Sequence, residues 1–450
     1  MTFKSTNPYT NTTISEHEIL TQNQLQQHLL WATKAFDAWK NTTFDERAYK
    51  MKKVAEILRA NINEWSLLIT NEMGKILSES KAEIEKSATN CDFYAENAEQ
   101  MLKDKPYNTP FYSRSVYDPT GAVFAIMPWN YPFWQVFRYA APAIMSGNVT
   151  LLKHAPNVIG CAKAIENIFL EAGFPKGVFQ QLTIDVPQIE NVMASNIVQG
   201  VTFTGSERAG VAVATLAAKH LKKTVLEMGG SDAFIVLKDA DLEKAATIAT
   251  QSRMINAGQA CICAKRCIVV PEIADDFAHL FAIKIKQLTQ GNPLLENTSI
   301  GPLARLDIAN NLRFQLQESL QQGAQLITGG NSDSCHFQPT LLDNVTDSNI
   351  AFQQETFGPL ATIIRATNEQ NAIDLANNHR YGLAASIWTK DTEKAYNLAR
   401  KMEAGNVFVN SMVRSDSRIP FGGIKKSGYG KELASIGIKE FMNIKSIIIE

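Results

Sequence analysis

Apolar residues recur every three or four positions through the first part of the chain, between residues 22 and 90. Leu29, Ala32 and Trp39 follow this spacing, and residues 48–62 repeat it. The spacing places the apolar side chains on one face of a helix. The sequence therefore predicts an opening layer made only of helices.

A different pattern begins near residue 111, where short apolar runs alternate with longer helix-like segments. The runs that predict strands are residues 111–117, 123–127, 149–152, 177–179, 201–204, 224–226, 233–236, 268–270 and 361–365. Strands that take turns with helices are typical of parallel, doubly wound sheets. Gly229 and Gly230 separate two such series. We therefore expect an α/β fold with two α/β domains, the first of which binds a nucleotide.

The chain ends in a bare β-branched strand, KSIIIE at residues 445–450. Such a strand exposes unpaired backbone groups and invites aggregation unless another strand covers it. We expect the cover to come from a partner subunit, in a homodimer or homotetramer. A length of 450 residues also exceeds what one hydrophobic core supports, which agrees with at least two domains.

Charge and hydropathy narrow the classes of function. The 44 Lys and Arg balance 45 Asp and Glu, so no net field would draw the chain to nucleic acid or to an anionic membrane. The most apolar region, residues 121–134, is short and contains Pro128 and Pro132, which argues against a membrane span. The first 13 residues are polar and lack the pattern of a secretory signal, which favours a cytoplasmic protein.

The cysteines indicate neither a disulfide framework nor a metal site. Six cysteines in 450 residues suit a reducing compartment. Cys261, Cys263 and Cys267 lie close together, but tetrahedral zinc needs four ligands, and no His or second CxxC pair lies beside them. We therefore expect no metal.

The segment GQAC at residues 258–261 is the first candidate for chemistry. A glycine near the thiol lets another segment or a ligand approach it closely. Taken alone the signal is weak, because a single cysteine is more often a small buried apolar residue than a nucleophile. Other motifs are needed before Cys261 is favoured as a nucleophile over a small buried apolar residue.

Six short segments together resemble the aldehyde dehydrogenase superfamily in order and spacing. They are PWNYP at 128–132, FTGS at 203–206, EMGG at 227–230, GQAC at 258–261, ETFGP at 355–359 and PFGG at 420–423. The resemblance covers nearly the whole chain. It implies oxidation of an aldehyde to a carboxylate with NAD or NADP, through a thioester on a cysteine.

The resemblance also implies three domains along the chain, each with its own role. We expect residues 1–107 and 121–228 to form a variant Rossmann domain that binds NAD(P), and residues 229–431 to form a second α/β domain that carries catalysis. Residues 108–120 and 432–450 would form a small β arm for oligomerisation.

For catalysis, the resemblance implies three residues. Cys261 would be the nucleophile, which must become a thiolate. The Asn130 side-chain amide and the Cys261 backbone N–H would stabilise the oxyanion. Glu227 would be the general base that activates water for cleavage of the thioester. Structural alternatives are a turn role for Asn130 between two prolines and a helix-start role for Glu227.

For the cofactor, the resemblance implies a dinucleotide at the start of the helix after FTGS. Gly205 and Ser206 would offer free backbone N–H groups and the positive end of the helix dipole to a pyrophosphate. The spacing is not the GxGxxG fingerprint, so we expect a variant Rossmann site. The further cofactor-binding residues that the resemblance implies are Trp129, Lys153, Pro156, Met228, Glu355 and Phe357.

Lys153 and Pro156 bear on the choice between NAD and NADP. NAD-selective members of the family tend to carry a glutamate three residues after this lysine, which binds the ribose hydroxyls and repels a 2′-phosphate. Pro156 stands there instead, and no dedicated arginine is visible to favour NADP. We expect NAD or NADP as cofactor, with NAD slightly favoured.

The finer details most resemble short bacterial succinate-semialdehyde dehydrogenases. They are WQVFR at 134–138, KHA at 153–155, GGSD at 229–232, CICAKR at 261–266 and RSD at 414–416. Succinic semialdehyde carries a carboxylate remote from its reacting carbon, and a guanidinium can bind this group with two hydrogen bonds. Arg138 is the candidate, with Trp134, Ser415 and Phe421 as further substrate residues.

Alternatives to this substrate site stay open. Arg138 could instead pair with an acid of a neighbouring domain, and Trp134 and Phe421 could be core residues. Longer relatives have an arginine six residues before the nucleophile, where this chain has Ile255. Whether Arg253, two residues earlier, takes the place of that arginine is left open by the sequence. Glutaric semialdehyde or another ω-carboxy or aliphatic aldehyde is therefore a second choice of substrate.

Two further alternatives concern the thiol itself. Cys263 could form a reversible disulfide that blocks Cys261, as in some relatives with a Cys-x-Cys segment, or it could be a spare buried thiol. A cysteine hydrolase would need a histidine beside Cys261, and none is evident in the sequence. A structural protein with a dehydrogenase fold that no longer catalyses a reaction would usually have lost Cys261 or Glu227. Both residues are present.

Overall fold

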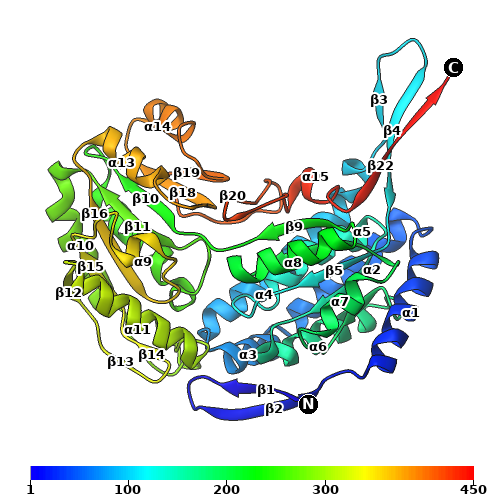
Figure 1. Ribbon diagram of the computed structural model, residues 1–450, viewed down its shortest axis with the longest axis horizontal. Coiled ribbons are helices and arrows are strands. Elements are labelled where there is room, and N and C mark those ends of the chain that lie inside the picture. Colours follow the sequence, from blue (N-terminus) through cyan, green and yellow to red (C-terminus); the bar gives the residue numbers. More distant parts are fainter. Residues whose placement is uncertain (1) are drawn as a thin grey trace.

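The computed structural model describes residues 2–450 and shows an α/β protein with two large sheets and a projecting arm (Figure 1). The α/β fold expected from the sequence is therefore confirmed. None of the helices within residues 2–450 is long and apolar enough to cross a membrane.

The chain does not open on helices, as the sequence led us to expect, but on an antiparallel hairpin. It consists of β1 (Thr2–Asn7) and β2 (Thr12–Glu18). A polar contact anchors it, because the buried Ser5 hydroxyl donates to Glu72 at 2.7 Å. The hairpin lacks the apolar alternation that identifies a strand. The helical layer follows as α1 (Gln22–Trp39), α2 (Phe44–Ala60), α3 (Ile62–Met73) and α4 (Leu77–Met101).

The first large sheet has six strands in the order β21-β9-β8-β5-β6-β7 and is parallel except for β21. Its strands are β5 (Ala122–Ile126), β6 (Val149–Lys153), β7 (Phe179–Gln181), β8 (Val198–Thr204), β9 (Lys223–Glu227) and β21 (Gly428–Tyr429). The helices between them are α5 (Trp134–Met145), α6 (Ile159–Glu171), α7 (Gln188–Met193) and α8 (Glu207–Lys219). The strand order reverses between β5 and β8, and ligands of doubly wound sheets bind at such a switch point.

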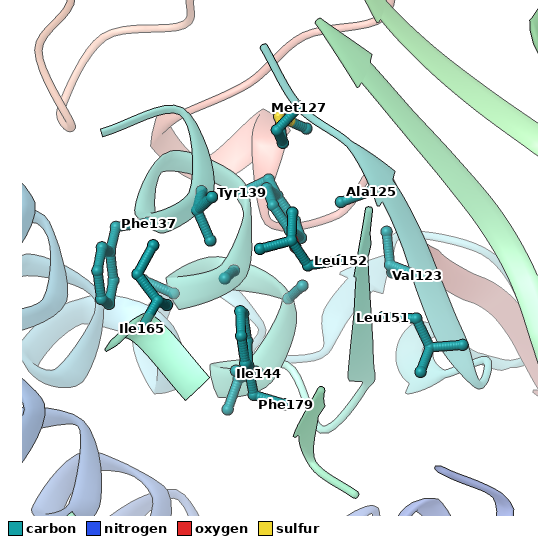
Figure 2. Packing of buried hydrophobic residues seen from close by; sticks show 14 of the residues in the cluster. Val123, Ala125, Met127, Phe137, Tyr139, Ile144, Leu151, Leu152, Ile165 and Phe179 are labelled. Carbon is teal, nitrogen blue, oxygen red and sulfur yellow. The ribbon is translucent and has the colours of Figure 1, made fainter. Parts of the chain in front are cut away.

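Apolar side chains fix this sheet against its helices. Figure 2 shows Leu152 of β6 pointing towards α5, beside Tyr139 and on the same side of the strand as Ile144, whereas Leu151 points to the opposite face of the sheet. All four side chains are buried. The core therefore holds α5 in place, and the segment just before α5 carries the PWNYP motif.

The second large sheet has seven strands in the order β12-β15-β16-β11-β10-β18-β19, and only β12 is antiparallel to its neighbour. Its strands are β10 (Asp232–Val236), β11 (Ala264–Val269), β12 (Gln325–Thr328), β15 (Thr340–Asp343), β16 (Leu360–Arg365), β18 (Ala384–Trp388) and β19 (Asn406–Val409). Its helices are α9 (Leu242–Met254), α10 (Ala274–Lys286), α11 (Leu306–Gln321), α12 (Ile350–Gln353), α13 (Glu369–Asn377) and α14 (Thr392–Ala399).

Short elements complete the chain. They are β13 (Ser332–Asp333), β14 (His336–Phe337), β17 (Tyr381–Gly382), β20 (Ile424–Lys425), α15 (Ala434–Gly437), and the 3-10 turns η1 (Pro156–Val158), η2 (Ile255–Gly258) and η3 (Pro271–Ile273).

The arm is a three-stranded antiparallel sheet that stands out from the body of the molecule (Figure 1). It contains β3 (Lys105–Tyr107), β4 (Tyr112–Pro119) and β22 (Met442–Ile449), in the order β22-β4-β3. The C-terminal strand thus pairs along one edge with β4 of its own chain, and its other edge is open within residues 2–450.

The apolar residues form two separate large clusters, one mainly within residues 25–228 and one within residues 233–402. Because each sheet has its own core, we propose the domain division expected from the sequence: residues 1–107 with 121–228, residues 229–431, and the arm of residues 108–120 with 432–450.

Candidate active site

The candidate nucleophile lies on a loop that needs unusual backbone angles. The loop runs from η2 to the start of β11, and Asn256, Ala257 and Gly258 have φ values of 53°, 51° and 72°. A Cβ on Gly258 would lie 2.2 Å from the carbonyl oxygen of Gly358. The glycine therefore lets the ETFGP segment approach the loop closely, as its place before Cys261 indicated.

Arg253 holds the same two segments together. Its guanidinium is fully buried and donates to the carbonyl oxygens of Thr356 at 3.0 Å, Gly358 at 2.6 Å and Leu360 at 2.8 Å. These bonds occupy the side chain inside the protein. Arg253 therefore supports the nucleophile loop and does not replace the substrate arginine of longer relatives.

Cys261 is half-buried and lines two cavities at once. Burial raises the pKa of its thiol to about 12; Lys265 and Arg138 act in the opposite direction, and Glu227 raises it further. The thiol of the isolated protein is therefore protonated at neutral pH and needs a proton acceptor before attack.

Lys265 links the nucleophile loop to Glu355. Its fully buried ammonium donates to the carbonyl oxygens of Ala260 at 2.9 Å and Cys261 at 2.7 Å, and forms a salt bridge with Glu355 at 3.1 Å. A Glu355 oxygen also accepts from the Gly230 N–H at 3.1 Å. One cation thus fixes the loop and the carboxylate that we expected to contact the cofactor.

Asn130 follows β5 and lies on the wall of one cavity with Cys261. Its side-chain amide donates to the backbone carbonyl oxygen of Gln259 at 3.0 Å. The backbone carbonyl oxygen of Asn130 accepts from the Asn256 side-chain amide at 2.8 Å. A primary amide has two N–H groups, so one remains to donate to an oxyanion.

Glu227 ends β9 and is 2% exposed. Among residues 2–450, no side chain donates a hydrogen bond to either carboxylate oxygen. Burial raises the pKa of this carboxyl to about 8, Arg138 opposes the rise, and Glu432 adds to it. The carboxyl does not line either cavity as it stands; a Cβ on Gly422 would lie 2.9 Å from its Oε1, so it packs against the PFGG segment.

The first cavity encloses about 350 Å³ beyond the carboxyl ends of β5, β8 and β9. Of the expected site residues it brings together Trp129, Asn130, Gly205, Ser206, Met228, Cys261, Glu355 and Phe357. The cavity therefore lies at the switch point of the sheet, where a dinucleotide is expected.

The details of this cavity fit a dinucleotide. Ser206 caps α8, a helix of 13 residues, which leaves N–H groups and the positive dipole end facing the cavity. A Cβ on Gly229 would lie 2.4 Å from Glu355 Oε2, so this glycine is required for the approach of the carboxylate. Trp129 and Phe357 meet edge to face at 5.7 Å between ring centroids and form an apolar wall.

Two expected cofactor residues lie outside this cavity, at the end of the neighbouring strand. Lys153 ends β6 and Pro156 begins η1, and neither lines the cavity. Burial lowers the pKa of Lys153, and the charge of Asp185 opposes this. Their position suits the adenosine end of a dinucleotide that extends along the carboxyl edge of the sheet.

The second cavity, of about 180 Å³, lies on the other side of Cys261. Its walls include all four expected substrate residues, Trp134, Arg138, Ser415 and Phe421, together with Lys86 of α4. Cys263 lines neither cavity; it is fully buried and its sulfur donates to the carbonyl oxygen of Ile255 at 4.0 Å.

Arg138 makes the contact that the sequence left open as an alternative. Its guanidinium forms a salt bridge with Glu432, and both side chains are buried. It also donates to Thr204 at 3.3 Å and lies 5.4 Å from the ring centroid of Phe421. Arg138 thus lines the cavity while Glu432 compensates its charge.

The chain is similar to known proteins along nearly its whole length. The sequence model of the Aldehyde dehydrogenase family matches residues 1–447. The chain belongs to the aldehyde dehydrogenase family.

Individual relatives of this aldehyde dehydrogenase match along its whole length. A Synechocystis protein described as a probable succinate-semialdehyde dehydrogenase for NADP(+) is 44% identical over 453 residues, with 100% of both chains covered. An Escherichia coli succinate semialdehyde dehydrogenase for NAD(P)+ is 42% identical, covering 98% of this chain and 97% of the relative. The crystal structure of a Streptococcus pyogenes succinic semialdehyde dehydrogenase with NADP+ has a TM-score of 0.98 at 35% identity, covering 99% of each chain.

Three residues of the candidate site were not identified from the sequence. Lys265 could have been noticed, because it follows the nucleophile by four residues in the CICAKR segment. Lys86 and Glu432 lie far from the motifs along the chain, and only the fold brings them to Arg138 and Ser415. Within residues 2–450, no group of three or more His, Cys, Asp or Glu side chains could hold a metal ion.

Proposed function

We propose that this NAD(P)-dependent aldehyde dehydrogenase oxidises succinic semialdehyde to succinate in the cytoplasm, through a thioester on Cys261. The observation that carries the proposal is the position of Cys261 where two cavities meet. One cavity lies at the switch point of a nucleotide-binding sheet, and the other has cationic side chains on its wall. The relatives described above carry the same substrate in their names.

In the first step, the Cys261 sulfur attacks the aldehyde carbon and its proton must leave. Solvent water can carry this proton away, and the charges of Lys265 and Arg138 favour the thiolate that remains. The oxyanion that forms would accept hydrogen bonds from the free Asn130 amide N–H and from the Cys261 backbone N–H. The nicotinamide of the bound cofactor supplies the acceptor for the hydride that leaves the former aldehyde carbon.

In the second step, water cleaves the thioester. Glu227 would remove the proton of this water, after its carboxyl turns from Gly422 towards the cavity. Succinate is then released and the Cys261 thiol is restored. Lys265 and Arg253 position the loop throughout, since each is buried and holds its backbone carbonyls.

The cofactor proposal covers both nicotinamide dinucleotides. The sequence favoured NAD slightly, and that preference stays a prediction. The names of the Synechocystis and Streptococcus relatives specify NADP, and the Escherichia coli name specifies NAD(P). Pro156 offers no carboxylate to repel a 2′-phosphate, so we propose that NADP is accepted as well as NAD.

A homodimer or homotetramer is proposed from the arm. Ile444, Ile448 and Ile449 of the edge strand β22 are 57%, 62% and 58% exposed. An open edge with exposed isoleucines favours pairing with a second copy.

The alternative of a cysteine hydrolase is less well supported. Among residues 2–450, no histidine lines either of the two cavities that contain Cys261.

The proposal is tested by the absorbance of the reduced nicotinamide with a panel of aldehydes and both cofactors. Succinic semialdehyde should give the highest kcat/KM, followed by glutaric semialdehyde and then by aldehydes without a carboxylate, such as butanal. A higher kcat/KM for butanal would overturn the substrate. No reduction with any aldehyde would overturn the activity.

A further inference from the structure

Lys86 brings a second cation to the wall of the substrate cavity. It lies on α4 and lines the cavity that also contains Cys261. Its ammonium donates to the Ser415 hydroxyl at 2.7 Å and lies 4.1 Å from the ring centroid of Trp134. Three elements that are distant in the sequence therefore meet around one positive charge.

The charge of Lys86 is less compensated than that of Arg138. Arg138 is bound to the buried Glu432 carboxylate. The two carboxylates whose charges act on Lys86, Glu83 and Asp416, are engaged elsewhere. Glu83 forms a buried salt bridge with Lys75, and Asp416 forms a solvent-exposed salt bridge with Arg418.

We propose that Lys86, together with Ser415, binds the carboxylate at the far end of the substrate, which makes Lys86 a specificity-determining residue. The inference rests on the proposed function. The ammonium and the hydroxyl are neighbouring donors, so each can serve one oxygen of a carboxylate once the Ser415 proton turns towards it. Trp134 holds the ammonium by a cation–π contact and restricts its motion before the substrate arrives.

The cavity strengthens this interaction. Its wall is partly closed from water, and a charge-assisted hydrogen bond is stronger where the local dielectric constant is low. Arg138 then forms part of the cavity wall through its apolar stem, with its charge compensated by Glu432. Lys86 supplies the net positive charge that attracts the carboxylate of the substrate. An aldehyde without a carboxylate gains nothing from Lys86.

The same geometry predicts a pH dependence. Burial lowers the pKa of Lys86 to about 8, Arg138 and Arg414 lower it, and Glu83 and Asp416 raise it. The ammonium is therefore charged below pH 8 and loses its charge above it. Binding of a carboxylate substrate should weaken as the pH rises through this value.

The test compares kcat/KM for succinic semialdehyde with kcat/KM for butanal, which has the same chain length and no carboxylate. In Lys86→Gln the ratio of the two values should fall about 10- to 100-fold, the range of a hydrogen bond to a charged group. Lys86→Arg should keep most of the ratio. Lys81→Gln, a matched change on the same helix, should keep the ratio within about twofold.

An unchanged ratio in Lys86→Gln, or an equal fall in Lys81→Gln, would overturn the role of Lys86. If Lys86→Gln does not fold, the wild-type protein carries the test: KM for succinic semialdehyde should rise through about pH 8 relative to KM for butanal, and parallel profiles would overturn the inference. A wild-type protein without any preference for succinic semialdehyde over butanal would instead overturn the proposed function.

Discussion

A Cβ atom on Gly258 would lie 2.2 Å from the carbonyl oxygen of Gly358. This approach joins the loop of the nucleophile to the segment that carries Glu355. The two halves of the site, one for the thiol and one for the cofactor, are therefore held in register by a position where only glycine fits.

Gly258→Ala should consequently damage both stability and turnover. The left-handed φ of 72° costs about 1–3 kcal/mol for a residue with a side chain, and the clash with Gly358 adds to it. We expect a fall in kcat of about tenfold or more, measured with an aldehyde and cofactor at saturation, and a lower urea midpoint.

Gly323→Ala is the matched control. Gly323 has a φ of 95°, but a Cβ there would meet nothing within 4 Å, so only the backbone cost applies. The control should lose about 1–2 kcal/mol of stability and keep its kcat. Equal effects of the two substitutions would contradict the role assigned to the contact with Gly358.

The raised pKa of Glu227 predicts how turnover depends on pH. Its carboxyl should act as a base only after it has lost its proton, so kcat should increase as the pH rises through about 8. Glu227→Gln should lower kcat about 100-fold or more and remove this rise. A Glu227→Gln variant that keeps the rise with pH would assign the ionisation to another group.

The same shift predicts a loss of stability with rising pH. The folded protein holds the Glu227 proton up to about pH 8, whereas the unfolded chain releases it near its ordinary pKa of 4.5. The free energy of unfolding should therefore decrease as the pH rises between these two values. Urea unfolding of wild type and Glu227→Gln across this range should show a shallower decrease in the variant.

Pro156 should control the choice of cofactor. In Pro156→Glu the new carboxylate would repel a 2′-phosphate and bind ribose hydroxyls, so KM for NADP should rise about tenfold or more relative to KM for NAD; Coulomb repulsion of this order is expected for like charges a few ångström apart. Pro156→Gln changes the shape without the charge. If it shifts the ratio of the KM values equally, charge repulsion is not the cause.

Cys263 predicts a response to oxidation. Peroxide would convert the Cys261 thiol to a sulfenic acid, and attack by the Cys263 sulfur would form a disulfide and release water. For this, Cys263 must give up its hydrogen bond to Ile255. We expect a thiol reductant to restore peroxide-treated wild type, whereas Cys263→Ala should proceed to the irreversible sulfinic acid. Equal recovery of both proteins would identify Cys263 as a spare buried thiol.

Sequence reasoning located the parts of the site that depend on backbone shape. Gly258, Gly205 and the residues after β5 stand in motifs because a close approach or a helix start requires them. The motifs therefore brought Cys261, Asn130 and Glu355 to one cavity. Periodicity likewise gave most strands of both large sheets, since their apolar runs are buried.

Contacts between side chains that are distant in the sequence could not be found in this way. No motif near Arg138 along the chain predicts its salt bridge with Glu432, and none near Ser415 predicts its hydrogen bond with Lys86. The N-terminal hairpin was missed for a related reason. A polar bond from Ser5 to Glu72, and not an apolar face, fastens it to the helices.

The central claim, a thioester on Cys261, is tested most directly by trapping it. Glu227→Gln lacks the base for hydrolysis, so one turnover with succinic semialdehyde and NADP, quenched in acid, should leave a succinyl group on the protein. Mass spectrometry of the digested variant should place that group on the peptide that contains Cys261, with one reduced cofactor formed per modified site. A succinyl group on another peptide, or reduced cofactor without any modified peptide, would contradict the account.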